Sequence, residues 1–369
     1  MQTNCAVGDV VLSLKYEEAQ TVCHREGDTA FRLTVRPEAE PINPSPWYAF
    51  TVETRSPATV TVTLDYGTYK HRYRPKKQIA PGVWQPLPLG RTQIMQEGTQ
   101  AQLTLALSTG QHHFAAQEML GVTDRADWVK AYTVRHGLIL REIGKSVEGR
   151  PIYGFTIGSP QPGANLVLIL GGQHPPEVPG TLGLYAFLDA LYAQPSTLER
   201  VLDRHVFLVV PDFNPDGVAG GHWRLNAGLI DLNRDWGPFT QPETQAVRAE
   251  MDALLTKGLK PKLLLDFHAT RRTVFYTPPE GLTLKPATLV SDWIGALTEA
   301  WPGDGPDESS NHNPDLPTAK VWFAETYGAP GVTVEFSDTF DREALQVFSK
   351  LAAETLLDLF ITATEGDRP

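Results

Sequence analysis

The stretch Leu166-Val-Leu-Ile-Leu-Gly-Gly-Gln-His174-Pro-Pro-Glu177 joins an uninterrupted apolar run, through a Gly-Gly turn, to a histidine and a glutamate. A short apolar run bounded by glycines is typical of a strand that is buried on both faces, as in a parallel sheet. Three more apolar runs follow along the chain, and polar residues stand in them or just after them: Asn214, His268 and Glu335. One arrangement is therefore repeated four times, in which a buried strand delivers a polar side chain.

Helical patterns separate these apolar runs. The predicted strands cover residues 166–170, 206–210, 262–267 and 332–336, and the predicted helices cover 179–192, 242–255, 286–300 and 342–360. Strands that alternate with helices form a mostly parallel sheet, because each crossover places a helix against one face of the sheet. We therefore predict an α/β domain over residues 120–369, with a mixed, largely parallel sheet flanked by helices.

The first 119 residues have a different pattern. Apolar and polar residues alternate in Thr59-Val-Thr-Val-Thr-Leu64 and in Gln102-Leu-Thr-Leu-Ala-Leu107, and Pro and Gly clusters break the segments apart. Alternation with period two is typical of short antiparallel strands with one buried face. We predict an all-β antiparallel sandwich over residues 1–119, and we assign Trp47, Tyr48 and Phe50 to its core and to the domain interface rather than to a ligand platform.

Composition excludes several classes of function. The chain of 369 residues is 41% hydrophobic and 20% charged, which suits a globular protein too long for a single ordinary core. Its formal net charge of -11 argues against nucleic acid as a partner. No apolar stretch approaches the roughly 18 residues that a membrane span requires. The oligomeric state is not indicated.

The two cysteines, Cys5 and Cys23, both lie near the N-terminus. Thiols used only for packing would be scattered through the chain, so the clustering predicts a disulfide that tethers the N-terminal strand. Disulfides persist in oxidising compartments, and the pair therefore favours an exported protein, periplasmic or secreted. Two unpaired thiols in a cytoplasmic protein stay open as the alternative.

Polar side chains that follow parallel strands meet at the carboxyl edge of the sheet. His174, Glu177 and His268 would meet there, and two imidazoles with one carboxylate form the three-ligand set of a catalytic zinc with one open position. We therefore predict one Zn²⁺ per chain. Glu335 reaches the same edge without being needed as a ligand, so it is available to act on a water molecule.

A polar segment between the second and third apolar runs adds further candidates. Asn233 and Arg234 combine a neutral donor with a planar guanidinium, the geometry that holds a carboxylate by parallel hydrogen bonds. Arg224 is a separate cation that could stabilise an oxyanion. Asp231 suits an outer role, in which it accepts the free N–H of a zinc-binding histidine.

Together these segments resemble the M14 zinc carboxypeptidases. The segments that carry the resemblance, in order, are Ile143-Gly-Lys-Ser-Val-Glu-Gly149, His174-Pro-Pro-Glu177, Asn214-Pro-Asp-Gly217, Arg224, Asp231-Leu-Asn233-Arg234, the strand ending at His268 and the strand of Glu335. The resemblance covers about residues 120–360. Residues 41–50, 70–76 and Trp84 resemble the β-sandwich that precedes the catalytic domain in the cytosolic-carboxypeptidase branch and its bacterial relatives.

The resemblance implies a peptide hydrolase that acts on a peptide or protein C-terminus. His174, Glu177 and His268 would bind zinc, and Glu335 would deprotonate the zinc-bound water and pass the proton to the leaving amine. Arg224 would polarise the scissile carbonyl. Asn233 and Arg234 would hold the terminal carboxylate of the substrate, which restricts cleavage to the last residue.

Two departures from the family pattern limit these assignments. Where pancreatic-type members carry a tyrosine, this chain has Asn311-His-Asn-Pro-Asp-Leu-Pro317, and Tyr327 lies too close to the last strand, so no catalytic tyrosine is assigned. Lys320 stands where the cytosolic branch carries a Gly-Thr-Gly-Arg-like segment. With Arg271 and Arg272 it predicts a preference for a C-terminal glutamate or aspartate; a solvated Lys320 is the alternative.

Three other functions stay open at this point. A zinc amidohydrolase of the aspartoacylase or desuccinylase type would share the zinc ligands, although we expect it to lack the N-terminal sandwich. A peptidoglycan-trimming carboxypeptidase would fit an exported protein. A non-catalytic binding protein on a peptidase fold would require a missing ligand or base, and none is missing here.

Overall fold

A computed structural model describes residues 4–14, 21–310 and 312–366, of which 363–366 are described as backbone only. The remaining residues of the two predicted domains, and Asn311 of the segment noted above, lie outside the described part. The chain divides into two compact units, one comprising Met1–Val122 with Asp216–Leu229 and the other Thr123–Pro215 with Ile230–Pro369. The predicted boundary at 119/120 did not include the segment 216–229 in the first unit.

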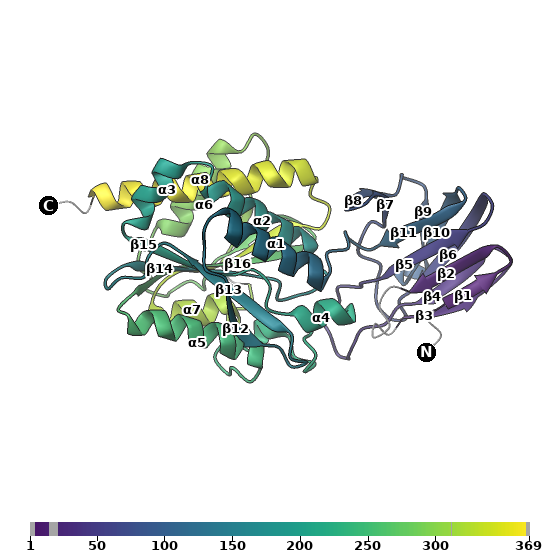
Figure 1. The fold of residues 1–369 in the computed structure, drawn as a ribbon, viewed down its shortest axis with the longest axis horizontal. Helices are drawn as coiled ribbons and strands as arrows, with labels where there is room; N and C mark the ends of the chain where they lie inside the picture. The colour runs from purple at the N-terminus through teal and green to yellow at the C-terminus, as the bar shows by residue number, and fades with distance from the viewer. Residues whose placement is uncertain (1–3, 15–20, 311, 367–369) are drawn as a thin grey trace. The chain divides into compact units, whose positions relative to one another are not determined.

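The first unit is a pair of sheets. The six-stranded sheet has the order β1-β2-β5-β11-β7-β8 and the five-stranded sheet the order β3-β4-β6-β10-β9 (Figure 1). The strands are β1 Asn4–Val7, β2 Val10–Leu14, β3 Val22–Arg25, β4 Ala30–Thr34, β5 Ala49–Thr54, β6 Ala58–Asp65, β7 Lys76–Ala80, β8 Val83–Pro86, β9 Thr92–Met95, β10 Gln100–Leu107 and β11 Gly110–Ala115, with a short helix η1 at Gln96–Gly98. The sandwich is antiparallel except at β4 and β6, which pair in parallel because β5 between them belongs to the other sheet.

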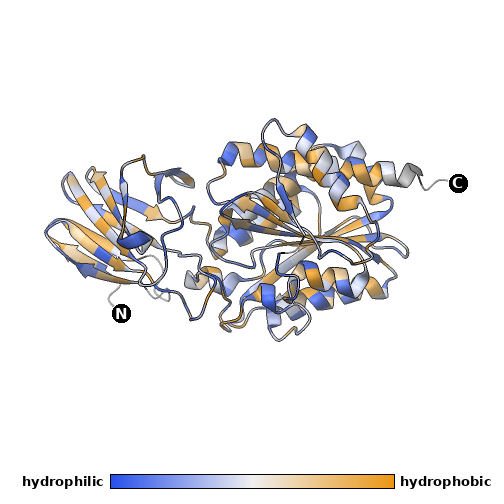
Figure 2. Ribbon diagram, turned by 180° about the vertical axis from the view of Figure 1, so that it is seen from behind, coloured by the Kyte–Doolittle hydropathy of each residue, from blue (hydrophilic) through white to orange (hydrophobic). Residues whose placement is uncertain are grey.

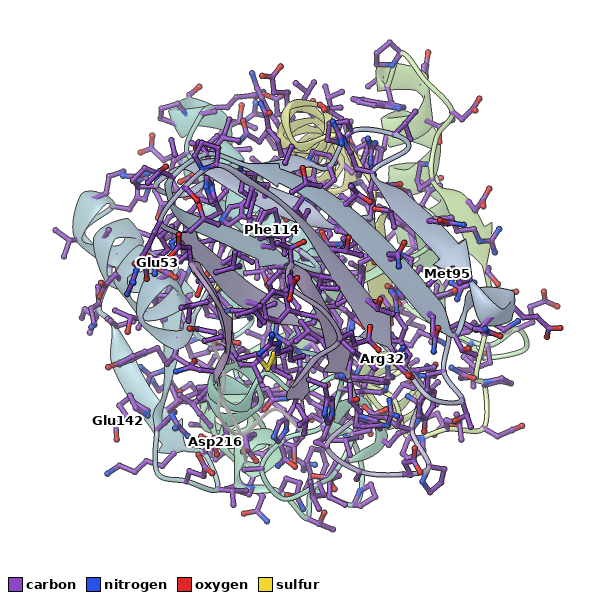
Figure 3. All side chains as sticks on the ribbon, turned by 90° about the vertical axis from the view of Figure 1, so that its right-hand side faces the viewer. Arg32, Glu53, Met95, Phe114, Glu142 and Asp216 are labelled. Carbon is purple, nitrogen blue, oxygen red and sulfur yellow. A yellow bond between two sulfur atoms is a disulfide. The ribbon has the colours of Figure 1, made fainter. Side chains whose placement is uncertain are left out.

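The core of the sandwich explains its sequence pattern. Alternate residues of β10 are buried, which gives the period of two seen in the sequence. Trp47, Tyr48 and Phe50 are buried in this core, in agreement with the prediction. The structure also joins Cys5 to Cys23 in the predicted disulfide, whose sulfur atoms are drawn in yellow in Figure 3. The compartment itself stays a prediction.

The second unit confirms the predicted α/β class. Its eight-stranded sheet has the order β12-β13-β15-β14-β16-β19-β17-β18, and β15, β14, β16 and β19 form the parallel centre. The strands are β12 Arg141–Lys145, β13 Pro151–Ile157, β14 Asn165–Gly171, β15 His205–Val210, β16 Lys260–Thr270, β17 Val274–Tyr276, β18 Asp307–Ser309 and β19 Gly331–Ser337. Antiparallel pairing of β12, β13 and β17 makes the sheet mixed.

Helices cover both faces of this sheet. In Figure 1, α2, α6 and α8 lie on one face, and α5 and α7 lie on the other. The helices of the chain are α1 Val122–Arg135, α2 Val178–Leu191, α3 Pro195–Leu202, α4 Pro215–Gly220, α5 Pro242–Thr256, α6 Leu289–Ala300, α7 Ala319–Tyr327 and α8 Arg342–Gly366, with η2 at Leu232–Arg234. Among the described helices, none combines the length and the hydropathy that crossing a membrane requires.

Residues 166–170 of β14 and 206–210 of β15 are all apolar because helices bury both faces of these two strands. All residues of β15 are buried, and Leu166–Leu170 of β14 are fully buried. These strands form the orange centre of the sheet in Figure 2. In β14 and β15 polar side chains therefore follow the apolar run, at the ends of the strands, and the candidate site forms there.

Candidate active site

Register brings the candidate residues together at one edge of the sheet. In the parallel pairing of β16 with β19, His268 lies opposite Glu335, so their side chains project from the same face. β14 ends at Gly171, whose partner on β16 is Phe267, and the following turn carries His174 and Glu177 back to His268. Three strand ends thus supply four of the predicted residues.

His174, Glu177 and His268 form a buried cluster whose potential ligand atoms all lie within 4.8 Å of one another. Nδ1 of His174 lies 2.9 Å from Oε1 of Glu177, and Nδ1 of His268 lies 2.7 Å from Oε2 of the same carboxylate. The two Nδ1 atoms are 3.1 Å apart. The cluster therefore presents two imidazole nitrogens and one carboxylate to a common point.

The partners of the two Nε2 atoms, on the side of each imidazole away from Glu177, indicate what the common point can bind. Nε2 of His174 lies 2.9 Å from Oδ1 of Asp231, and Nε2 of His268 lies 2.9 Å from Oδ2 of Asp266. A carboxylate can only accept, so each Nε2 carries a proton, and with a cation bound each Nδ1 would turn its lone pair to that cation. Acceptors that converge in a buried place need a cation, and this donor set fits zinc.

The charges in the cluster act in the same direction. Burial alone would raise the pKa of Glu177, but the charges of His174 and His268 and their hydrogen bonds outweigh it and hold that pKa well below its ordinary value. Burial alone would lower the pKa of His268, but Asp266 and Glu177 outweigh it and raise that pKa well above its ordinary value. The surroundings thus favour an ionised Glu177 and positive charge beside it.

Asp266 is a functional candidate that the sequence analysis missed. Gln173 donates to its Oδ2 at 2.6 Å, and Trp236 orients Gln173 by donating to Oε1 at 3.1 Å. A signal was present, because Asp266 and His268 are two apart on a strand and so share a face. A carboxylate therefore contacts each ring: Asp231 contacts His174, and Asp266 contacts His268. The functional roles of both carboxylates stay predictions.

The turn that carries two of the proposed ligands is held from other elements. Arg125 of α1 donates to the Pro175 carbonyl at 3.1 Å and forms a buried ion pair with Asp212, also at 3.1 Å. Asn214 Nδ2 donates to the Gln173 carbonyl at 2.8 Å. Gly180 of α2 allows close approach on the other side, because a Cβ there would come within 2.6 Å of the His268 backbone.

We expect the purified protein to contain about one zinc per chain, bound by His174, Glu177 and His268. Asp266→Asn should weaken zinc binding about 10- to 100-fold, because it removes the charged partner of the His268 ring. Elemental analysis and competition with a chelator measure both quantities, and Asp307→Asn, on an exposed side chain, is the control. A protein that takes up no transition metal would contradict the assignment.

Asn233 and Arg234 lie in η2, and Asn233 contacts Ala319, the first residue of α7. The Asn233 side-chain oxygen accepts from Ala319 N at 3.0 Å, so its NH₂ end is left to donate elsewhere. Asp231 caps η2 by accepting from Asn233 N at 2.9 Å, and Arg234 donates to the Asn233 carbonyl at 2.7 Å. One short turn thus links the proposed carboxylate clamp to the carboxylate that orients His174.

Lys320 is the buried cation of the three that the sequence analysis considered. Its side chain comes from the first turn of α7, it is 2% exposed, and its Nζ has no hydrogen-bond partner among the described residues. Burial, with a contribution from nearby Arg234, lowers the pKa of Lys320 to about 8. Arg271 and Arg272 are exposed, and Arg272 pairs with exposed Asp307 at 2.7 Å.

Two aromatic residues that the sequence analysis missed lie near these charges. Tyr276 of β17 stacks on His312 with ring centroids 3.9 Å apart. Burial and the charge of Glu335 raise the pKa of Tyr276, and burial with the charges of Lys320 and Arg234 lowers the pKa of His312. No periodic sequence signal pointed to Tyr276, because β17 is only three residues long. Tyr327 packs instead with Trp322 and Phe323.

Arg224 belongs to the first unit, although the sequence places it between proposed site residues of the second. It is 7% exposed, and the neighbouring Trp223 is part of the sandwich core. Its proposed role stays a prediction from the resemblance.

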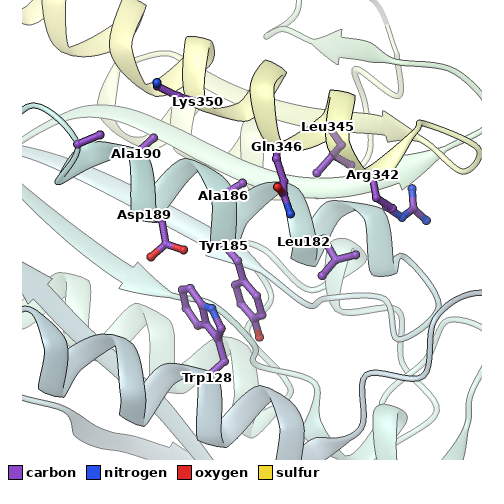
Figure 4. A pocket seen from close by; sticks show the side chains of 11 residues that line it. Trp128, Leu182, Tyr185, Ala186, Asp189, Ala190, Arg342, Leu345, Gln346 and Lys350 are labelled. Carbon is purple, nitrogen blue, oxygen red and sulfur yellow. The ribbon is translucent and has the colours of Figure 1, made fainter. Parts of the chain in front are cut away.

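A cavity elsewhere in the second unit is a different feature from this site. It has a volume of about 570 Å³, lies between α2 and α8, and includes the stacked pair Trp128 and Tyr185 (Figure 4). None of the proposed site residues lines it. The alternation of side chains along β19 explains why the cavity and the site are separate. Phe336 packs against Gly183 of α2, so the neighbouring Glu335 points to the opposite face of the sheet.

Comparison with known proteins gives a consistent result. A sequence model of the family described as zinc carboxypeptidase matches residues 127–294. Cytosolic carboxypeptidase 6 of Mus musculus is 32% identical over 136 residues, which cover 34% of this chain and only 24% of that protein. The chain thus matches about a quarter of this curated relative.

Solved structures are similar over almost the whole chain. A metallo-carboxypeptidase from Burkholderia cenocepacia aligns with a TM-score of 0.79 at 19% identity, covering 97% of this chain and all of that one. A metallo-carboxypeptidase from Pseudomonas aeruginosa, in complex with (2-guanidinoethylmercapto)succinic acid, aligns with a TM-score of 0.72 at 21% identity and covers 96% and 99% of the two chains. At such identities the likeness establishes the fold.

Proposed function

We propose that this chain, in which residues 127–294 match the zinc carboxypeptidase family, is an M14 zinc metallocarboxypeptidase that removes the C-terminal residue of peptides. The observation that carries the proposal is the buried cluster of His174, Glu177 and His268 with Glu335 in register beside it. The proposal assigns the cluster as the ligand set and the separate carboxylate of Glu335 as the proton acceptor.

The proposed mechanism divides the work among the residues of this chain. Zinc held by the cluster would act as a Lewis acid toward water and the scissile carbonyl. Glu335 takes a proton from the attacking water as the water oxygen bonds to the scissile carbonyl carbon, and then delivers that proton to the amine nitrogen as the carbon–nitrogen bond breaks. Arg224 stabilises the negative charge that develops on the carbonyl oxygen.

Recognition of a free C-terminus follows from the second set of residues. Arg234 and the NH₂ group of Asn233 would bind the terminal carboxylate by charge-assisted hydrogen bonds. Because Asn233 is fixed by Ala319 and by Asp231, its amide is oriented before substrate binds, which reduces the entropy lost on binding. A substrate without a terminal carboxylate loses these interactions.

The finer part of the proposal is a preference for acidic C-terminal residues. Lys320 is buried beside Arg234, and a buried ammonium group is costly unless an anion compensates it. A glutamate or aspartate side chain of the substrate would supply that anion. Arg271 and Arg272 do not take part in recognition of the acidic side chain in this proposal, because both are exposed.

Lys320→Met should reduce the preference for a peptide ending in Glu over one ending in Leu by about 10- to 100-fold, the effect of losing a hydrogen bond to a charged group. The ratio of the two kcat/KM values measures this, and Lys350→Met, on an exposed lysine that pairs with Glu354, is the control. If the ratio were close to one in the unmodified protein, Lys320 would have no role in specificity.

The same ratio should depend on pH. The folded pKa of Lys320 is lowered to about 8, so the ammonium charge is present below that pH and is lost as the pH rises through it. The ratio of kcat/KM for Glu- and Leu-terminated peptides should therefore fall above about pH 8, because kcat/KM reports the free enzyme. Groups common to both substrates cancel in the ratio.

A peptide library with free and varied C-termini tests the proposal as a whole. Release of single C-terminal residues by the zinc-loaded protein is the expected result. Cleavage of N-acyl amino acids without cleavage of peptides would instead indicate an amidohydrolase, and release only from cell-wall peptides would indicate a peptidoglycan-trimming enzyme. Binding without any release would indicate a non-catalytic protein.

A further inference from the structure

One carboxylate of the sandwich unit binds three consecutive peptide groups beside Arg224. Oε1 of Glu38 accepts from the backbone N–H groups of Arg224 at 2.9 Å and Leu225 at 2.6 Å, and Oε2 accepts from that of Trp223 at 2.7 Å. Glu38 lies in the connection between β4 and β5, and both partners of these bonds belong to the first unit. The segment is therefore held by its backbone at the position of the proposed catalytic arginine.

This arrangement is specific in its physical chemistry. Successive N–H groups that point to one anion form a concave nest, and hydrogen bonds to an ionised acceptor are about twice as strong as neutral ones. The neighbouring side chain supports the same placement, since Trp223 is 1% exposed in the sandwich core and meets Tyr69 edge to face with ring centroids 5.3 Å apart. His222 adds a local bond, from its ring to the Leu225 carbonyl at 3.0 Å.

We infer that Glu38 is a positioning residue for Arg224, because its carboxylate fixes the backbone that carries this side chain. The inference rests on the proposed function, because Arg224 must act on the scissile carbonyl for its orientation to matter. Three bonds to one carboxylate restrict the backbone of residues 223–225, so the guanidinium starts from a defined backbone position. Glu38 then has a role beyond stabilising the fold of the first unit.

A double-mutant cycle tests the inference, using Glu38→Gln, Arg224→Ala and the double variant. Gln keeps one acceptor oxygen but turns an NH₂ group toward a backbone N–H, so the nest is broken with little change in volume. We expect Glu38→Gln to lower kcat about 10-fold with little change in KM and in zinc content. Arg224→Ala should lower kcat about 10²- to 10³-fold, as loss of an oxyanion donor does.

The decisive measurement is the additivity of the two changes. If Glu38 acts through Arg224, the double variant should be no slower than Arg224→Ala within about twofold, a coupling that general destabilisation of the sandwich would not produce. Glu53→Gln, the same change at an exposed position of β5 in the same unit, should leave kcat unchanged (Glu53 is labelled in Figure 3). Glu38→Asp, which keeps the charge, replaces Glu38→Gln in the cycle if that variant does not fold.

The possible failures are distinguishable. Unchanged kcat in Glu38→Gln, or fully additive losses in the double variant, would overturn the positioning role while leaving the proposed function intact. Unchanged kcat in Arg224→Ala would remove the proposed role of the arginine itself, and the inference with it.

Discussion

Glu335→Gln is expected to lower kcat about 10²- to 10⁴-fold, the range seen when a general base is lost. Glutamine has nearly the same shape as glutamate, but its amide cannot take a proton from water at neutral pH. Glu335 lies opposite His268 in the sheet and is not one of the three residues that present ligand atoms to a common point. Zinc content, measured by elemental analysis, should therefore stay at about one per chain while turnover falls.

The control for this variant is Glu325→Gln, the same change on an exposed side chain of α7. It should leave both turnover and zinc content unchanged. Near-normal turnover of Glu335→Gln would show that another group is the base. Loss of zinc together with turnover would show that Glu335 supports the metal rather than the proton transfer.

Amidation of the substrate's C-terminus is expected to lower kcat/KM about 10²- to 10⁴-fold. Amidation removes the charge that Arg234 and Asn233 are proposed to bind, and a charged group left without its partner in a desolvated site costs about 3 to 5 kcal/mol. Arg234→Ala should slow cleavage of the free peptide by a similar factor. The same variant should scarcely change cleavage of the amidated peptide, because the interaction is already absent.

Four values of kcat/KM test this prediction: those of the unmodified protein and of Arg234→Ala, each on the free and on the amidated peptide. Arg135→Ala is the matched control, since Arg135 is an exposed arginine of α1 that pairs with Asp189. Equal cleavage of free and amidated peptides by the unmodified protein would rule out a carboxypeptidase and favour an endopeptidase or an amidase. Equal losses on both substrates in Arg234→Ala would indicate a role in folding rather than in binding the carboxylate.

The class of each domain was readable from local patterns. Strands β14 and β15 contain continuous apolar runs because helices cover both of their faces, and β6 and β10 alternate because only one face is buried. The convergence of His174, Glu177 and His268 was also predictable, since the carboxyl ends of parallel strands share one edge of the sheet. Burial and strand direction are properties that a single segment already expresses.

Long-range packing decided the rest. The segment 216–229 joined the sandwich because Trp223 enters its core and Glu38 binds its peptide groups, and neither contact leaves a periodic pattern in the sequence. The parallel pairing of β4 with β6 depends on which sheet receives β5. Asp266 could have been found from its spacing to His268, whereas the burial of Lys320 could not, because it depends on the position of α7 over the sheet. Contacts between residues far apart in the chain have no local signature, and so only the folded structure reveals them.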